Sequence, residues 1–127
     1  MKKVTGIGGI FFKSKDPDKL KAWYQSHLGI EATDEAGAIF EWRDADDPDK
    51  TEYTVWGPFP RDTEYFKPSN APFMINYRVQ NLDELIDELR QSGLEVSGPQ
   101  EHPEGIFAWV MDPEGNKIEL WEPVAGT

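Results

Sequence analysis

The strongest constraint on the fold is that the chain consists of two halves with the same order of elements. Each half reads as a strand, a helix that ends at a glycine, and three further strands. The expected helix N-caps Asp16 and Asn81 lie 65 positions apart, and the helix-ending glycines Gly29 and Gly93 lie 64 apart. A duplicated βαβββ unit predicts an α+β fold, because each unit alone would leave one face of its sheet bare.

The two modules are expected at about 1–60 and 72–127, joined by a loop at 61–71, within a single domain of 127 residues. The predicted strands lie at 4–13, 30–33, 38–43 and 52–59 in the first module, and at 73–79, 94–97, 106–111 and 117–121 in the second. Together they predict two curved, mixed or antiparallel sheets, each backed by a helix, around a cleft.

Helix start and stop signals are present in both modules. Asp16 is a favourable N-cap, Pro17 suits the first helical position, and a capping box at 81–84 opens the second helix. The spacing predicts a buried stripe in each helix. The stripe of the first helix comprises Leu20, Trp23, Tyr24, His27 and Leu28, and that of the second Leu82, Leu85, Ile86 and Leu89.

The closing segment 111–123 predicts a hairpin. Pro113 suits the second position of a turn and Gly115 supplies a positive φ, so the strand at 117–121 should pair with the run 106–110. Ile118 and Leu120 then face the core, whereas Lys117, Glu119 and Trp121 face the other side of the sheet. Glu119 is the residue on which the functional question depends.

Composition excludes several classes of protein. Without cysteine the chain has neither a redox thiol nor a Cys-ligated zinc, and no apolar run is long enough to cross a membrane. The formal charge of −11 argues against nucleic acid and anionic membranes as partners, so a soluble cytoplasmic protein is expected. The acidic surface is either a solvated exterior or an attraction for cationic ligands.

Strand alternation predicts which side chains line the cleft. The candidates for a ligand-binding cleft are Phe11, Glu52, Thr54, Trp56, Met74, Asn76, Arg78, Glu119 and Trp121, with Lys13 and Lys117 on the same side. Trp56 and Trp121, related by the repeat, would flank a flat or cationic ligand, or would only fill the sheet interface or a dimer seam.

The helix entries KDPDKLKAWYQSHLGI and VQNLDELIDELRQSGLEV and the closing DPEGNKIELWEP resemble the vicinal oxygen chelate superfamily over nearly the whole chain. This superfamily includes glyoxalase I, bleomycin-resistance proteins and extradiol dioxygenases. The resemblance implies a metal ion held by one side chain from the first and last strand of each module. It also implies a homodimer.

The family's metal-ligand positions fall on Gly9, Thr54, Met74 and Glu119, and only Glu119 is a competent ligand. Glycine has no side chain and a thioether is a poor ligand for hard divalent ions, so no metal cofactor is expected. An improvised oxygen-ligand site of Glu52, Asn76 and Glu119 is an alternative. Glu119 otherwise either pairs with Lys117, Arg78 or Lys13, or anchors an organic ligand.

Two classes of function stay open at this stage. The favoured one is a metal-free superfamily member that binds a small organic molecule, cationic or aromatic, in the cleft. The alternative is a metal-dependent lyase or dioxygenase of glyoxalase type that uses Glu119 with atypical ligands, and a purely structural dimerisation module is a third possibility. His27, at a helix C-terminus, and His102, in a loop, are not expected to be catalytic.

Overall fold

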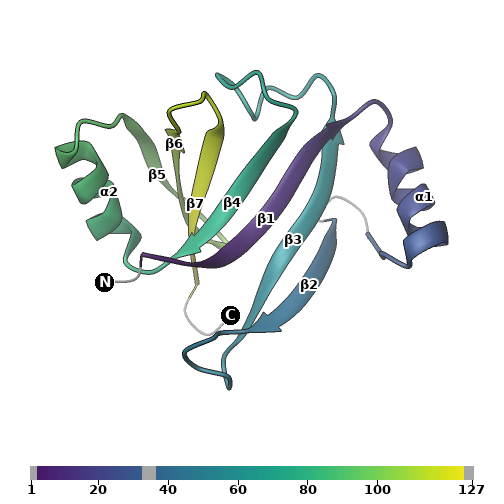
Figure 1. Ribbon diagram of the computed structural model, residues 1–127, viewed down its shortest axis with the longest axis horizontal. Helices are drawn as coiled ribbons and strands as arrows, with labels where there is room; N and C mark the ends of the chain where they lie inside the picture. The colour runs from purple at the N-terminus through teal and green to yellow at the C-terminus, as the bar shows by residue number, and fades with distance from the viewer. Residues whose placement is uncertain (1–2, 33–36, 125–127) are drawn as a thin grey trace.

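The computed structural model describes residues 3–32 and 37–124, and they form a seven-stranded mixed sheet with two helices (Figure 1). Along the chain the elements are β1 (Val4–Ser14), α1 (Pro17–Leu28), β2 (Ala38–Arg43), β3 (Thr51–Pro60), β4 (Phe73–Val79), α2 (Leu82–Gln91), β5 (Val96–His102), β6 (Gly105–Met111) and β7 (Lys117–Pro123). The strand order is β2-β3-β1-β4-β7-β6-β5. The predicted α+β fold of repeated units is confirmed.

The two halves meet where β1 and β4 pair as antiparallel neighbours in the middle of the sheet. On either side of this pair the arrangement repeats, because β1 runs parallel to β3 and β4 runs parallel to β7. The two expected sheets are therefore one continuous sheet. The first half contributes one strand fewer, since residues 30–32 of the predicted strand 30–33 are not in a strand, and Thr33 lies outside the described residues.

Both helices cover the same face of the sheet. Cross-strand partners point to one side, and the register pairs Ile10 with both Trp56 and Ile75. Trp56 packs against Tyr24 of α1, while Tyr77, two positions after Ile75, packs against the core beneath α2. We call this side the outer face and the opposite side, on which the cleft was expected, the inner face.

Helix α1 begins and ends as predicted but lies loosely on the sheet. The Asp16 side chain accepts a hydrogen bond from the Lys19 backbone, and Gly29 ends the helix in the left-handed region. None of the described residues of α1 is buried, and Trp23 and Leu28 are 50% and 61% exposed. The prediction of a buried stripe on this helix is therefore wrong, because Leu20 and Tyr24 are only partly buried and the other stripe residues are exposed.

Helix α2, in contrast, covers the hydrophobic core. The core cluster consists of Val79, Leu82, Leu85, Ile86, Ala108 and Leu120, all from the second half of the chain. The predicted capping box is wrong, because Asn81 adopts a left-handed conformation with φ of 52° and its side chain makes no described cap contact. Glu122 of β7 caps the helix instead, accepting a hydrogen bond of 2.8 Å from the Leu82 backbone.

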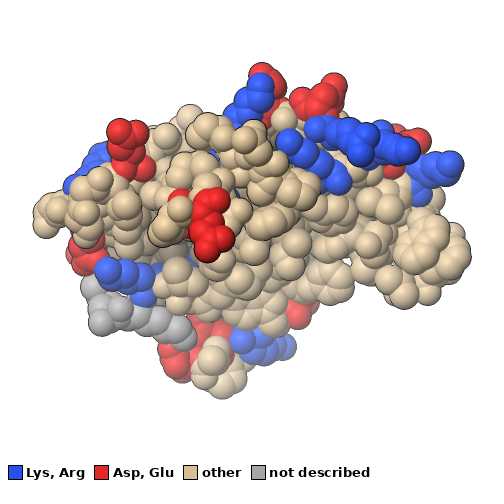
Figure 2. Space-filling view, turned by 45° about the horizontal axis from the view of Figure 1, so that its top comes forward, with Lys and Arg blue, Asp and Glu red and all other residues tan. Residues whose placement is uncertain are grey.

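The surface is uneven in charge despite the excess of acids. Figure 2 shows lysine and arginine side chains gathered toward the end of the molecule that carries α1, while acidic side chains are scattered. Helix α2 carries Asp83, Glu84, Asp87 and Glu88 against a single basic residue, Arg90. Among residues 3–32 and 37–124, neither helix has the length and apolar character needed to span a membrane.

Gly8 of β1 allows the inner face to close over the central strands. A Cβ atom at this position would lie 2.2 Å from Asn76 Oδ1 and 2.9 Å from Arg78 Cγ. Both side chains are buried, so neither is able to move away cheaply.

We therefore expect Gly8→Ala to lower the free energy of unfolding by about 2 to 3 kcal/mol, the upper range for overpacking a core. Urea denaturation would measure this loss. Gly57→Ala is the matched control, because its Cβ would meet only Phe11 Cδ1 at 3.8 Å. An equal loss in the two variants would contradict the proposed close approach.

Candidate functional site

The centre of the inner face is the buried carboxylate of Glu119, which is only 3% exposed. Oε1 accepts a hydrogen bond of 2.7 Å from the Asn76 side-chain amide, and Oε2 accepts one of 2.8 Å from the Trp109 indole. Oε2 also accepts a hydrogen bond from the Tyr65 hydroxyl. Three neutral donors thus satisfy a buried charge, in place of the predicted pairing with Lys117, Arg78 or Lys13.

Tyr65 brings the loop between β3 and β4 onto this carboxylate. The next residue, Phe66, is fully buried, and both rings contact Phe59 of β3. Burial raises the pKa of the Tyr65 hydroxyl, and the neighbouring Glu119 carboxylate raises it further. The loop is therefore fixed to the sheet by one buried ring and one hydroxyl.

A second buried charge lies beside this cluster. The Arg78 side chain passes over Gly8 and reaches β3, where it donates to the Tyr53 carbonyl at 3.2 Å and pairs with Glu52 at 2.5 Å. Its guanidinium carbon lies 5.1 Å from the centre of the Tyr53 ring and 4.6 Å from that of Trp121. The protein's own side chains thus fill this part of the predicted cleft.

The structure places most of the predicted cleft residues on the inner face. Phe11 packs edge to face with Phe59, Met74 is fully buried, and Trp121 stacks on Phe107. Glu52 joins them through Arg78.

Thr54 and Trp56 are the exceptions, and their predicted place on the inner face is wrong. Trp56 packs against Phe12 and Tyr24 on the outer face, and Thr54 bonds the Trp42 indole at 2.8 Å. The register gives the reason. Gly9 lies beside both Val55 and Asn76, and Asn76 lies beside Glu119, so the counterpart of Glu119 in β3 is Val55. The offset of 65 was one residue too long for this strand.

The side chains at the family's ligand positions do not fit a divalent metal. Both Glu119 oxygens are already engaged, Gly9 offers no donor, and Met74 is a buried thioether. The improvised alternative fares no better, because Arg78 and Lys50 occupy both oxygens of Glu52. The described residues contain no group of three His, Cys, Asp or Glu side chains that could hold an ion.

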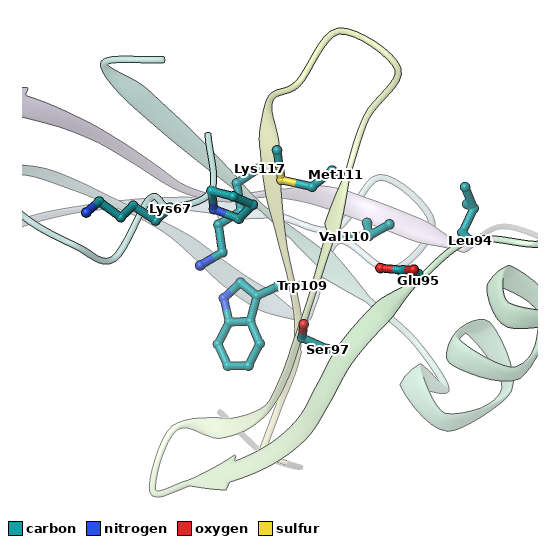
Figure 3. A pocket seen from close by; sticks show the side chains of 9 residues that line it. Lys67, Leu94, Glu95, Ser97, Trp109, Val110, Met111 and Lys117 are labelled. Carbon is teal, nitrogen blue, oxygen red and sulfur yellow. The ribbon is translucent and has the colours of Figure 1, made fainter. Parts of the chain in front are cut away.

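An open pocket of about 300 Å³ lies next to the Glu119 cluster (Figure 3). The loop, the start of β5 and the hairpin β6–β7 form its wall. The lining residues are Lys67, Pro68, Leu94, Glu95, Ser97, Trp109, Val110, Met111 and Lys117. Its lining combines one large aromatic ring, aliphatic side chains and a few charged groups, as small-molecule sites do.

Lys117 is the charged group best placed to meet a ligand. Figure 3 shows its amine pointing toward the Trp109 ring, whereas Lys67 extends away. Lys67 also pairs with Glu64 at 2.6 Å. The Lys117 amine donates to the Tyr65 carbonyl at 2.7 Å and lies over the Tyr65 and Trp109 rings. Burial lowers the pKa of Lys117, although the Glu119 carboxylate opposes this shift.

Neither histidine belongs to this site. His27 is exposed and stacks on Trp23 within α1, with centroids 4.6 Å apart. His102 is also exposed, but it ends β5 instead of lying in a loop, and it contacts Gln100 and Phe107.

Two features of the site were missing from the sequence prediction, namely Trp109 as a donor to Glu119 and Tyr65 as the contact from the loop. The first had a signal, because a hairpin centred on the predicted turn at 112–116 places Trp109 opposite Glu119. For the second, the aromatic pair Tyr65 and Phe66 in the loop suggested either an anchor or a place at the mouth of the cleft, but no periodic pattern connects residue 65 to residue 119.

The sequence profile of the glyoxalase-like domain family matches residues 9–121, which is most of the chain. The protein belongs to this family. No curated protein sequence matches the chain. The resemblance to the vicinal oxygen chelate superfamily is thus confirmed, and the glyoxalase-like domain has the expected repeated fold.

Solved structures share this fold at low sequence identity. Methylmalonyl-CoA epimerase from Streptomyces coelicolor is 19% identical with a TM-score of 0.67, covering 96% of this chain and 99% of that one. The Mycobacterium tuberculosis epimerase is 24% identical with a TM-score of 0.60, over 95% and 89% of the chains. A Legionella pneumophila chain described as NAD-dependent benzaldehyde dehydrogenase is 13% identical with a TM-score of 0.57, over 91% and 98%. These likenesses show the fold alone.

The raised pKa of Tyr65 predicts how the stability of the glyoxalase-like domain depends on pH. Because the folded state holds this proton more tightly, the stabilisation is complete below the unfolded tyrosine pKa of about 10 and declines above it. Because Tyr65 is 40% exposed and solvent screens the interaction, wild type should lose its advantage over Tyr65→Phe by less than about 1 kcal/mol between pH 9 and pH 11. Urea unfolding at several pH values would measure the difference, and a constant difference would contradict it.

Proposed function

We propose that this glyoxalase-like domain binds a small organic molecule with an aromatic body and an anionic group, and that it needs no metal to do so. The observation that carries the proposal is the Lys117 amine beside the Trp109 ring at the edge of an open pocket. The ring offers a flat apolar surface and the amine offers a charge-assisted hydrogen bond.

The local charge favours an anion over the cationic guest that the net charge of −11 suggests. Lys117 keeps hydrogen-bonding capacity after its bond to the Tyr65 carbonyl, since an ammonium has three donors. Glu119 is a poor direct partner for a cationic ligand, because it is buried and its oxygens already accept three hydrogen bonds. Glu95 is the one acid among the described lining residues and is outnumbered by Lys67 and Lys117, while more distant surface acids act weakly because salt screens them beyond about 8 to 10 Å.

The alternative of a glyoxalase-type lyase or dioxygenase has no specific support in the described residues. Such chemistry needs a metal with several protein ligands, and the oxygens of Glu52 and Glu119 are committed to other partners. The structural neighbours named as methylmalonyl-CoA epimerases support the common fold, and their substrate is not part of this proposal.

Three naphthalene probes that differ only in charge would test the ligand class. We expect 2-naphthoate to bind more tightly than 2-naphthalenemethanol, and 2-naphthalenemethylammonium to bind least. Lys117→Met should weaken 2-naphthoate about five- to tenfold, the value of one exposed charge contact, and leave the neutral probe unchanged. Quenching of tryptophan fluorescence would give the affinities.

Lys67→Met is the matched control, because Lys67 lines the same pocket but points away and pairs with Glu64. It should change the 2-naphthoate affinity by less than about twofold. Tighter binding of the ammonium probe than of 2-naphthoate would contradict the anionic ligand and support a cationic one. Failure of all three probes to bind would favour a purely structural role.

Assembly as a homodimer is also part of the proposal. Helix α1 leaves Trp23 and Leu28 largely exposed, and Ile10 of β1 is exposed on the same outer face. Beside α2 the outer face has an apolar groove of about 730 Å³ lined by residues such as Leu89, Val110 and Ile118. The lysines of α1 and the four acids of α2 are complementary in charge, so we propose that α1 of one copy lies beside α2 of the other.

In sedimentation velocity the protein should therefore have twice the 14.5 kDa mass of the chain. Trp23→Glu should shift it toward the monomer, because the exposed indole would be buried between copies. Ile39→Glu is the control, since Ile39 is equally exposed but lies on the edge strand β2. If only Ile39→Glu dissociates the dimer, the interface lies at the sheet edge formed by β2 and not at α1. A monomeric wild type would contradict the proposed homodimer.

A further inference from the structure

The carboxylate at the family's metal-ligand position contacts the two side chains that shape the proposed ligand pocket. Glu119 Oε2 accepts from both the Trp109 indole and the Tyr65 hydroxyl. We infer that Glu119 is a positioning residue of this pocket, acting through Trp109 and Tyr65 where other family members hold a metal ion. Its effect on ligand affinity rests on the proposed function, but its effect on the pocket wall does not.

The contact to Trp109 fixes the ring that a ligand would stack on. Trp109 and Glu119 are direct partners in the β6–β7 ladder, and the indole nitrogen lies 2.8 Å from Oε2. Trp109 is buried, with 9% of its surface exposed, and it lines the pocket. A buried indole N–H without an acceptor is costly, so the carboxylate selects one orientation of the ring.

The contact to Tyr65 fixes the pocket's cation and its wall. The Tyr65 hydroxyl is held by Glu119, while its backbone carbonyl accepts the 2.7 Å hydrogen bond from Lys117. The residues that follow it in the loop, Lys67 and Pro68, line the pocket. Glu119 therefore fixes the Trp109 ring directly. Through Tyr65 it also positions the Lys117 amine and the loop residues that line the pocket.

The variant Glu119→Gln keeps the size of the side chain but removes its capacity to accept three hydrogen bonds. A single uncharged Gln oxygen would have to accept from both Tyr65 and Trp109, and the Gln amide would keep its contact with Asn76 only if the Asn76 amide turned to present Oδ1, which has no described partner. We expect the affinity for 2-naphthoate to fall about tenfold or more. We also expect the Trp109 indole N–H resonance to move in the ligand-free protein. Trp109→Phe assigns this resonance among those of the five tryptophans.

Glu122→Gln is the matched control for a merely structural effect. Glu122 is also a carboxylate of β7, but it accepts its hydrogen bond from the Leu82 backbone N–H, caps α2 and does not line this pocket. It should destabilise the protein without moving the Trp109 resonance or changing 2-naphthoate binding. Equal changes in the two variants would overturn the inference.

Tyr65→Phe provides a milder second variant in case Glu119→Gln does not fold. It keeps the ring and removes one donor, so it should speed amide hydrogen exchange across residues 61–72 and weaken 2-naphthoate about threefold. Unchanged exchange in the loop would contradict the role of Tyr65. If wild type binds no 2-naphthoate, the proposed function fails, and the resonance and exchange measurements still decide the positioning role.

Equilibrium dialysis against Ni²⁺, Zn²⁺ and Mn²⁺ completes the test. Wild type should bind none of them stoichiometrically, because Glu119 is committed to its three donors. One equivalent of metal bound by wild type and lost in Glu119→Gln would show that the carboxylate is a metal ligand, and the inference would be wrong.

Discussion

The arrangement of the inner face depends on the need to satisfy one buried negative charge. A carboxylate removed from water requires several hydrogen bonds, and Glu119 obtains three from three separate elements. Asn76 comes from β4, Trp109 from β6 and Tyr65 from the loop. The Tyr65 hydroxyl is one of these donors. The buried carboxylate therefore helps to determine where the loop that carries Tyr65 lies on the sheet. The pocket beside Lys117 is the space that this position of the loop leaves.

Close packing on the inner face also explains the glycine at position 8 of β1. Arg78 crosses β1 to reach Glu52 and Tyr53, and it is able to do so only because Gly8 has no side chain. The crossing fills the part of the inner face between Tyr53 and Trp121. Arg78 Nε and Asn76 Oδ1 keep no hydrogen-bond partner among the described residues. Two polar atoms thus stay without a hydrogen bond where Arg78 fills the centre of the inner face, while the pocket beside Lys117 stays open.

Periodicity and turn chemistry predicted both helices and all seven observed strands, since alternation, caps and the turn at 112–116 are local signals, but they also predicted a strand at 30–33 whose described residues form none. The repeat predicted the pairing of the halves for the same reason. The misplaced residues Thr54 and Trp56 show the limit of that arithmetic, because a shift of one position exchanges the faces of a strand. Asn81 and Glu122 show another limit, since the cap of α2 comes from a residue 40 positions away. The contact of Tyr65 with Glu119 was not predicted, because the path of a loop depends on its tertiary contacts and has no periodic pattern in the sequence.

The unequal burial in the two halves has a consequence for how the molecule resists disruption. Every member of the described core cluster belongs to the second half, whereas α1 buries no described side chain. Cooperative unfolding free energy is therefore concentrated in the segment from β4 to β7. We therefore expect the backbone amides of α1 to exchange sooner than those of the segment from β4 to β7. The repeat in the sequence is thus not matched by an equal share of buried side chains in its two halves.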